Sequence, residues 1–274
     1  MLAWRNGKSI SDTLLSNRGL AYGDGLFETI KVVAGHAQFL ELHLQRLQRD
    51  CRRLDIALDI AALRAELDSV LHLNRDGILK IVVTRISNER GYNAPRNADG
   101  ERLLLFYPQY FAVDARARNG VAVKLCRQTL AEQPVLAGIK HLNRLEQVIA
   151  RAEWRDPQIA EGLLLDRAGR LIEGTFCNVF LVKERVLFTP RLHRCGVAGV
   201  MREIVLQQAS QLLLTACERD LVPDDLYTAD EVFLTNSVIG IWPVCKIDCL
   251  RKPIGDVTIA LQQQLNKIIA DEIA

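Results

Sequence analysis

One lysine carries the most distinctive chemical signal in this sequence of 274 residues. Lys140 stands in the segment Ala137-Gly-Ile-Lys-His-Leu-Asn-Arg144, between a glycine and the expected start of a helix. A lysine in such a bend can be partly desolvated, which lowers the pKa of its ammonium group and exposes an amine suited to Schiff-base chemistry. Only nine lysines accompany 26 arginines, so lysine is not the general surface cation of this chain. The alternative interpretation, an ordinary loop lysine, is the one that composition alone favours.

Three other features fit the binding of a phosphate-bearing cofactor. The segment Gly196-Val-Ala-Gly199-Val-Met-Arg202 is a glycine-flanked loop that opens a helix, where free N–H groups and the helix dipole attract an anion. Arg46, on an expected helix, could donate charge-assisted hydrogen bonds to a phosphate. Asn236-Ser237, at the end of an expected strand, could add polar contacts. Each feature alone also fits an ordinary turn, a solvated helix face or a strand end.

One carboxylate completes the set of candidate groups. Glu173 lies in Ile172-Glu-Gly-Thr-Phe-Cys-Asn178, directly before an expected apolar strand. It could pair with a protonated heterocyclic nitrogen, or it could be a turn residue exposed to water. The five histidines, at positions 36, 43, 72, 141 and 193, are scattered, and most of them are expected on the surface or in caps. The motifs typical of nucleotide-binding loops, zinc peptidases and serine hydrolases do not occur.

The periodicity of apolar residues predicts the elements that must position these groups. Apolar residues from Leu40 to Leu54 recur at steps of four and three, which predicts a helix with one apolar face. A strand is expected over 26–33. Further helices are expected over 143–154 and 200–214, and a polar loop over 87–100.

The expected strands and helices alternate without the regular rhythm of a doubly wound sheet, which predicts a mixed α/β fold. A segment with little periodicity marks the boundary between two domains. We expect a small N-terminal domain over 1–112, a linker over 113–119 and a larger domain over 120–274.

Composition excludes several classes of protein. Apolar residues make up 49%, charged residues 25%, and the formal net charge is +2, values typical of a soluble globular protein. No concentrated basic stripe occurs, so nucleic-acid binding is not expected. Seven cysteines without a CxxC pair predict reduced thiols and no metal site. No apolar run is long enough for a membrane span or forms a signal peptide, so we expect a cytoplasmic protein.

Taken in order, six segments resemble the fold-type IV pyridoxal-phosphate enzymes along nearly the whole chain. That family includes branched-chain aminotransferases, D-amino-acid aminotransferases and aminodeoxychorismate lyases. The resemblance implies a small N-terminal α/β domain, a larger C-terminal pseudo-barrel domain, the cofactor pyridoxal 5'-phosphate and a homodimer. The segments are Tyr22-Gly-Asp-Gly-Leu-Phe-Glu-Thr29, His43-Leu-Gln-Arg-Leu47, Gly138-Ile-Lys-His-Leu-Asn-Arg144, Glu173-Gly-Thr-Phe-Cys-Asn-Val-Phe180, Gly199-Val-Met-Arg202 and Thr235-Asn-Ser-Val-Ile-Gly-Ile-Trp-Pro-Val244.

The resemblance also implies a role for each candidate residue. Lys140 matches the lysine that forms the Schiff base with the cofactor and later moves protons. Glu173 matches the carboxylate that pairs with the pyridine nitrogen and keeps the ring an electron sink. The implied phosphate contacts are Arg46, the backbone amides of Val200 and Met201, and the strand end at Asn236 and Ser237. Arg144 falls near a position where branched-chain members carry a tyrosine, and its role stays open.

Within the family, the motifs around Lys140 and Ser237, together with Arg90-Gly-Tyr92, most resemble the lyase branch. This implies conversion of 4-amino-4-deoxychorismate into 4-aminobenzoate and pyruvate for folate biosynthesis, with no keto acid consumed. Because this substrate carries two carboxylates, Arg90 and Tyr92 in the long loop are candidates to bind it, as is Arg144. A D-amino-acid or branched-chain aminotransferase on the same fold, and a non-catalytic relative, stay open as alternatives.

Overall fold

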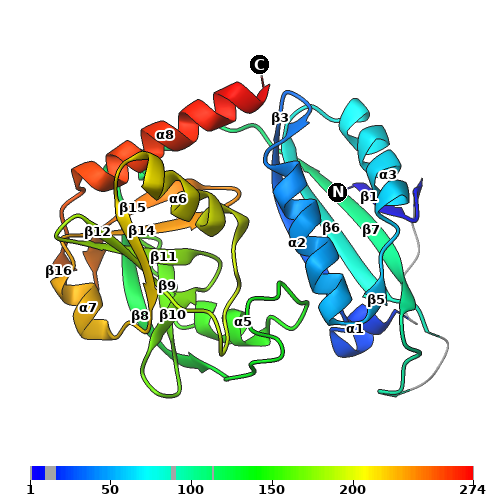
Figure 1. The fold of residues 1–274 in the computed structure, drawn as a ribbon, viewed down its shortest axis with the longest axis horizontal. Helices are drawn as coiled ribbons and strands as arrows, with labels where there is room; N and C mark the ends of the chain where they lie inside the picture. The colour runs from blue at the N-terminus through cyan, green and yellow to red at the C-terminus, as the bar shows by residue number, and fades with distance from the viewer. Residues whose placement is uncertain (1, 10–16, 88–90, 113, 274) are drawn as a thin grey trace. The chain divides into compact units, whose positions relative to one another are not determined.

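The computed structural model describes residues 2–9, 17–87, 91–112 and 114–273, and it forms two compact units (Figure 1). The first unit comprises Met1–Ala112 together with Lys140–Asn143. The second comprises Val113–Ile139 and Arg144–Ala274. The chain therefore leaves the second unit at Lys140, contributes four residues to the first, and returns at Arg144.

The described part of the first unit is a seven-stranded sheet with helices packed on it. The strand order is β2-β1-β7-β6-β3-β4, with β5 paired to β7. Burial alternates along β3, where Glu28, Ile30 and Val32 are buried between partly exposed neighbours, the period expected of a sheet with one covered face. In chain order the elements are β1 (Leu2–Arg5), β2 (Lys8–Ser9), α1 (Arg18–Tyr22), β3 (Gly25–Val33), β4 (His36–Ala37), α2 (Leu40–Arg53), β5 (Ile56–Ala57), α3 (Ile60–Leu73), β6 (Gly77–Arg85) and β7 (Ala98–Pro108).

The second unit contains a curled, mixed sheet of nine strands among its described residues, with the order β10-β9-β8-β15-β14-β11-β12-β13 and β16 paired to β15. Figure 1 shows α6 and α8 lying along this sheet. Its apolar core includes Val179, Leu181, Leu234 and Val244, all almost fully buried. The elements are α4 (Ala115–Asn119), β8 (Val121–Leu130), α5 (Leu145–Arg151), β9 (Ile159–Asp166), β10 (Leu171–Gly174), β11 (Asn178–Lys183), β12 (Val186–Pro190), α6 (Val200–Gln211), β13 (Thr215–Arg219), α7 (Pro223–Thr228), β14 (Glu231–Asn236), β15 (Gly240–Ile247), β16 (Leu250–Arg251) and α8 (Asp256–Ile273).

The predicted fold class, a mixed α/β fold, is confirmed. The helix predicted from Leu40 is α2, and its predicted apolar face is buried at Leu44, Leu47 and Cys51. No helix within the described ranges is long and apolar enough to cross a membrane.

The ends of three elements differ from the predicted ends, because tertiary contacts decide them. The helix expected over 143–154 is shorter, as α5, and the one expected over 200–214 ends at Gln211 because Leu213 adopts a positive φ of 54°. The polar loop is also shorter than expected. Strand β7 already begins at Ala98, because Ile56 pairs with it.

Two features depart from the predicted domain ranges. The predicted linker over 113–119 contains helix α4, which Asp114 caps by accepting from the Arg116 N–H at 3.0 Å. In addition, Lys140–Asn143 group with the first unit rather than with the larger C-terminal one. The division into a small and a large domain stays a prediction.

Candidate active site

Lys140 is fixed beside β3 in the first unit. The Phe27 N–H donates to the Lys140 carbonyl at 3.0 Å, and the Leu142 N–H donates to the Gly25 carbonyl at 3.0 Å, so this short segment extends the sheet. The Nζ atom of Lys140 lies 4.2 Å from the centroid of the Phe27 ring. A second cation, the Nζ atom of Lys80, lies 5.0 Å from the same centroid. The amine of Lys140 is therefore held at an aromatic face, where a cation is favoured.

A buried carboxylate on α2 supports the backbone of Lys140. Asp50 is almost fully buried, and its Oδ2 atom accepts from the Lys140 N–H at 3.4 Å. Burial raises the pKa of Asp50, and the neighbouring Arg49 guanidinium opposes that rise. Helix α2 is thus tied directly to the segment that carries the candidate nucleophile.

Arg46 belongs to a buried cluster in the same unit. Its guanidinium donates to both oxygens of Glu28, and the Nε to Oε1 distance is 2.8 Å. The Nδ1 atom of His43 lies 2.6 Å from the Oε2 atom of Glu28. Although burial raises the pKa of Glu28, Arg46 and His43 outweigh it and lower the value to about 2. Glu28 is therefore ionised, so it can only accept, and His43 must carry its proton on Nδ1.

His43 is an exception to the expectation that most histidines lie on the surface or in caps. It is fully buried. Burial lowers the pKa of His43, so its imidazole is neutral and Nε2 carries the lone pair. Nε2 is buried and makes no hydrogen bond to any described residue. That Arg46 contacts a phosphate stays a prediction.

Glu173 lies in the second unit, on β10, so the alternative interpretation of a turn residue exposed to water is wrong. It is 4% exposed, and its Oε2 atom accepts from the Val197 N–H at 2.8 Å. The segment 196–198 also hydrogen-bonds to Gly138. The Gly138 N–H donates to the Gly196 carbonyl at 2.9 Å, and the Gly138 carbonyl accepts from the Ala198 N–H at 3.1 Å. Because Gly138 precedes Lys140 by two residues, one segment fixes both the carboxylate and the backbone that leads to the lysine.

The loop before α6 approaches its neighbours so closely that it requires glycine. A Cβ on Gly199 would lie 2.1 Å from the Oδ1 atom of Asn178. Asn178 in turn donates to the Val197 carbonyl at 2.8 Å. Among the described residues, no side chain caps the N-terminus of this 12-residue helix, which begins with the N–H groups of Val200 and Met201. A phosphate would fit this helix start.

The strand end at 236–237 is organised by its own asparagine. The Oδ1 atom of Asn236 accepts from the N–H groups of Val238 and Ile239 at 2.8 and 3.0 Å. Its Nδ2 atom donates to the Phe176 carbonyl at 3.1 Å. The Asn236 side chain thus shapes the turn that holds Ser237, and direct contact of either residue with a cofactor stays a prediction.

The three predicted substrate residues are placed differently. Arg144 precedes α5 and is partly buried, which lowers its pKa, and the negative charges of Glu173 and Glu146 oppose that effect. Arg90 lies outside the described residues. Tyr92 is 89% exposed, and its ring meets the edge of Tyr22 with centroids 5.4 Å apart. Their contacts with substrate stay predictions.

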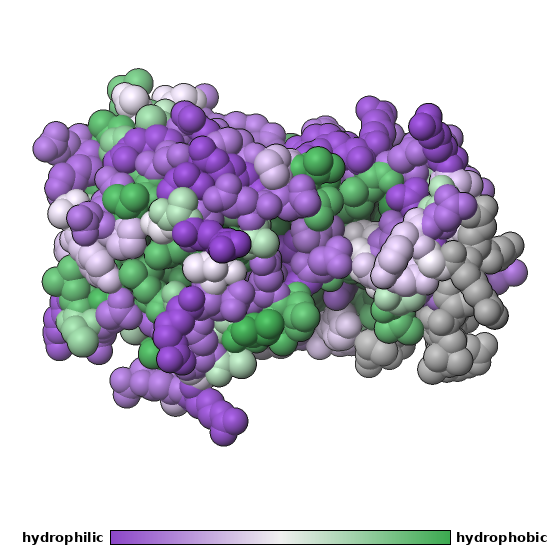
Figure 2. Space-filling model, turned by 90° about the horizontal axis from the view of Figure 1, so that it is seen from below, coloured by the Kyte–Doolittle hydropathy of each residue, from purple (hydrophilic) through white to green (hydrophobic). Residues whose placement is uncertain are grey.

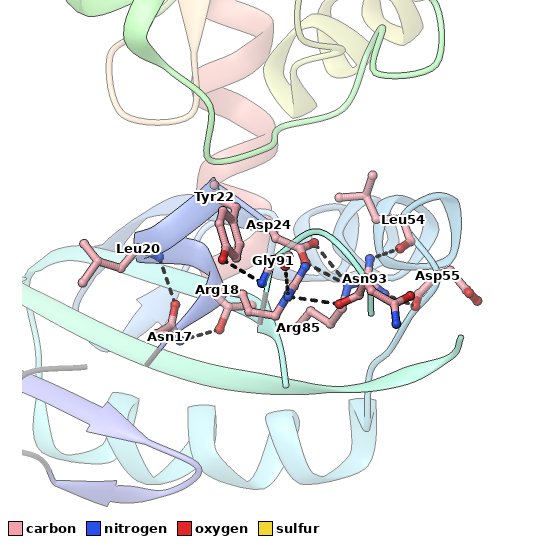
Figure 3. A network of polar contacts seen from close by, with 12 residues as sticks. Asn17, Arg18, Leu20, Tyr22, Asp24, Leu54, Asp55, Arg85, Gly91 and Asn93 are labelled. Atoms are coloured by element: carbon pink, nitrogen blue, oxygen red, sulfur yellow. Dashed lines mark hydrogen bonds and ion pairs between the residues drawn. The ribbon is translucent and has the colours of Figure 1, made fainter. Parts of the chain in front are cut away.

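A charged network holds the loop that carries Tyr92 (Figure 3). The Arg18 guanidinium donates to the Gly91 carbonyl at 2.9 Å and to Asp24 at 2.8 Å. Arg85 donates to the same Asp24 oxygen at 2.9 Å, and to the carbonyls of Leu54 and Asp55 at the end of α2. The loop is therefore braced against α2 through two arginines and one carboxylate.

We expect Arg18→Met to raise the KM for substrate about tenfold while kcat and cofactor content stay near wild type. The reason is that charge-assisted hydrogen bonds contribute about 1.5–3 kcal/mol and here they fix the loop backbone. Steady-state kinetics measures the effect. The matched control is Arg102→Met, which removes a similarly buried pair with Glu66 in the same unit. An unchanged KM for Arg18→Met, or an equal rise in the control, would contradict the brace.

Several groups near the candidate residues escaped the sequence analysis. Phe27, Asp50 and Glu28 reach Lys140 or Arg46 only through the pairing of distant elements. One signal was available: the alternation along β3 places Phe27 and Glu28 on opposite faces of the sheet.

The chemistry of these groups fits one kind of cofactor. A lysine amine, a buried carboxylate and a helix start without a described capping side chain are groups that could hold a phosphate-bearing pyridine. The curled mixed sheet places the chain in the aminotransferase-like class of folds. The model of the family described as Amino-transferase class IV matches residues 25–247, and the chain belongs to that family.

Individual relatives give a finer comparison. The chain is similar to a crystal structure of 4-amino-4-deoxychorismate lyase from Pseudomonas aeruginosa, with 49% identity, a TM-score of 0.93, and coverage of 97% of this chain and 98% of that one. It is 35% identical to the aminodeoxychorismate lyase of Vibrio harveyi over 96% of this chain and 99% of the relative. A D-alanine aminotransferase of Bacillus licheniformis is 28% identical over 85% of this chain and 82% of the relative.

Proposed function

We propose that this chain is a pyridoxal-phosphate-dependent carbon–oxygen lyase that converts 4-amino-4-deoxychorismate into 4-aminobenzoate and pyruvate, a step in folate biosynthesis. The observation that carries the proposal is the 49% identity to a lyase over 97% of the chain, against 28% for a D-alanine aminotransferase and 30% for a putative branched-chain aminotransferase. The alternative is a D-amino-acid or branched-chain aminotransferase on the same fold.

The residues of the chain have distinct tasks in this reaction. When bound, the cofactor supplies an electron sink. The Nζ atom of Lys140 removes the proton from the ring carbon that bears the substrate amino group, and it returns a proton to the departing enolpyruvate. Glu173 holds a proton on the pyridine nitrogen. Loss of the enolpyruvyl ether makes the ring aromatic, so no keto acid is needed.

Binding of cofactor and substrate falls to the other predicted residues. The N–H groups of Val200 and Met201, Arg46, and the strand end at Asn236 and Ser237 bind the phosphate. The two substrate carboxylates are met by cationic and hydroxyl groups, for which Arg144, Arg90 and Tyr92 are the candidates. The partly buried Arg144 guanidinium and the braced loop at Tyr92 support this assignment.

The direct test measures the formation of 4-aminobenzoate through the fluorescence of this product. Purified protein loaded with pyridoxal phosphate receives aminodeoxychorismate without any keto acid, and we expect continuous product formation. Adding a keto acid should leave the rate unchanged. A loaded protein that forms no product here, but transfers the amino group of D-alanine or leucine to a keto acid, would favour the aminotransferase.

The chain also exposes an apolar surface on α5 that supports a homodimer. Leu145, Val148 and Ile149 project from this helix with exposed fractions of 68, 63 and 48%, and Val135 precedes it at 71%. Figure 2 shows hydrophobic groups gathered in patches on one face of the molecule. Exposed apolar clusters of this kind are typical of interfaces.

All seven cysteines are free, as is typical of the reducing cytoplasm, where we place the protein.

We expect Val148→Asp to weaken the dimer at least about tenfold, because a charge buried in an apolar interface costs free energy. Size-exclusion chromatography with light scattering measures the oligomeric state. Leu213→Asp is the matched control, since Leu213 is 95% exposed in the turn after α6. A wild-type protein that is monomeric at micromolar concentration, or a Val148→Asp variant that remains dimeric, would contradict the assignment.

A further inference from the structure

One fully buried carboxylate in the second unit has no part in the function proposed above. Glu161, on β9, has no exposed surface. Burial raises its pKa, and the hydrogen-bond donors around it oppose that rise. Burying a carboxylate this deeply costs free energy unless hydrogen-bond donors compensate it.

The donors that reach Glu161 come mainly from one tight turn, residues 174–177. The Oε2 atom accepts from the Phe176 N–H at 3.0 Å, and Oε1 accepts from the Thr175 hydroxyl and from the Gly162 N–H at 2.8 Å. Gly174 is packed so closely that a Cβ would lie 2.8 Å from Oε2. The carboxylate thus sets the shape of the turn.

This turn contacts two strand ends that carry predicted cofactor residues. Glu173 immediately precedes it, on β10. The Phe176 carbonyl, within the turn, accepts from the Asn236 side chain at 3.1 Å, and Asn236 organises the backbone around Ser237. A displacement of the turn would therefore move two candidate groups together: Glu173, the partner of the ring nitrogen, and the phosphate contact at Asn236 and Ser237.

We propose that Glu161 is a positioning residue, whose carboxylate shapes the 174–177 turn and thereby sets the alignment of Glu173 with the Asn236–Ser237 strand end for the cofactor. The inference rests on the proposed function, because it assumes that these groups bind pyridoxal phosphate. It adds a residue that touches neither cofactor nor substrate.

Glu161→Gln tests the proposal, because glutamine keeps the shape of the side chain but turns one acceptor oxygen into a donor. Glu231→Gln is the matched control. Glu231 is also buried in the second unit, and it likewise accepts from two backbone N–H groups and one threonine hydroxyl, those of Val257 and Thr258 at the start of α8. Both variants should lower the thermal midpoint of the apoprotein to a similar extent.

The decisive readouts concern the cofactor. We expect Glu161→Gln to weaken the affinity for pyridoxal phosphate about tenfold, and to shift the pH midpoint of its visible absorbance. Glu231→Gln should leave both near wild type. Wild-type affinity and an unshifted pH midpoint in Glu161→Gln would overturn the proposal, and so would equal losses in both variants, since these would indicate a merely structural role.

A milder variant covers the case in which Glu161→Gln does not fold. Thr175→Val removes one donor to Glu161 and keeps the turn, and we expect it to weaken cofactor affinity about threefold. No change in Thr175→Val would then overturn the proposal. Failure of the proposed lyase function gives a different result, because wild-type protein would then form no 4-aminobenzoate, whereas failure of this inference leaves wild-type activity and cofactor absorbance intact.

Discussion

Replacement of Lys140 by alanine is expected to abolish the visible absorbance of the bound cofactor and to lower turnover at least about 10³-fold. The amine is the only group assigned both to the covalent attachment and to proton transfer, and proton transfer alone typically contributes 10²–10⁴-fold. Absorbance spectra of the loaded protein and the 4-aminobenzoate assay measure the two effects.

The control for this variant is Lys80→Ala. Lys80 is a second lysine at the face of Phe27, so its removal tests whether any nearby cation suffices. We expect Lys80→Ala to keep the visible absorbance, because the attachment requires the amine of Lys140. If colour and turnover both survived Lys140→Ala, the assignment of Lys140 would be wrong.

The second large effect is expected at Glu173. Glu173→Ala should retain part of the cofactor, since other groups hold the phosphate, but it should lose about 10²–10³-fold in kcat, the range seen when one preorganised charge-stabilising group is removed. A shifted absorbance maximum of the loaded variant would accompany the loss. Spectra and kcat are measured on the same preparation.

Glu153→Ala is a suitable control for this variant. Glu153 is a carboxylate of the same unit that pairs with Lys124 and accepts backbone N–H groups, and no role in the reaction is assigned to it. Its removal should leave kcat near wild type. Unchanged turnover in Glu173→Ala would refute the role of Glu173.

The elements were predictable where one face of a helix or strand is buried. The stripe on α2 and the alternation on β3 follow from apolar spacing alone, and both elements form as expected. The early start of β7 was not predictable, because Ala98 is a strand residue only through its pairing with Ile56. Helix α4 escaped notice because its five residues bury no apolar side chain.

The candidate site was likewise predictable only where the signal is local in the sequence. Lys140 and Glu173 are signalled by short local segments, so the sequence indicated them. Asp50 and His43 contribute through groups that are distant in sequence, and the burial of His43 is decided by the packing of α2 on β3. The grouping of Lys140–Asn143 with the first unit likewise depends on pairing with β3, at Leu26 and His141.

The most direct test of the lyase assignment is the stoichiometry of the reaction without a keto acid. Pyruvate and 4-aminobenzoate are quantified together while loaded enzyme acts on excess aminodeoxychorismate. The account predicts equal amounts of both products over many turnovers per active site. Product formation that stops near one equivalent per site and resumes only when a keto acid is added would contradict it, since that is the behaviour of an aminotransferase.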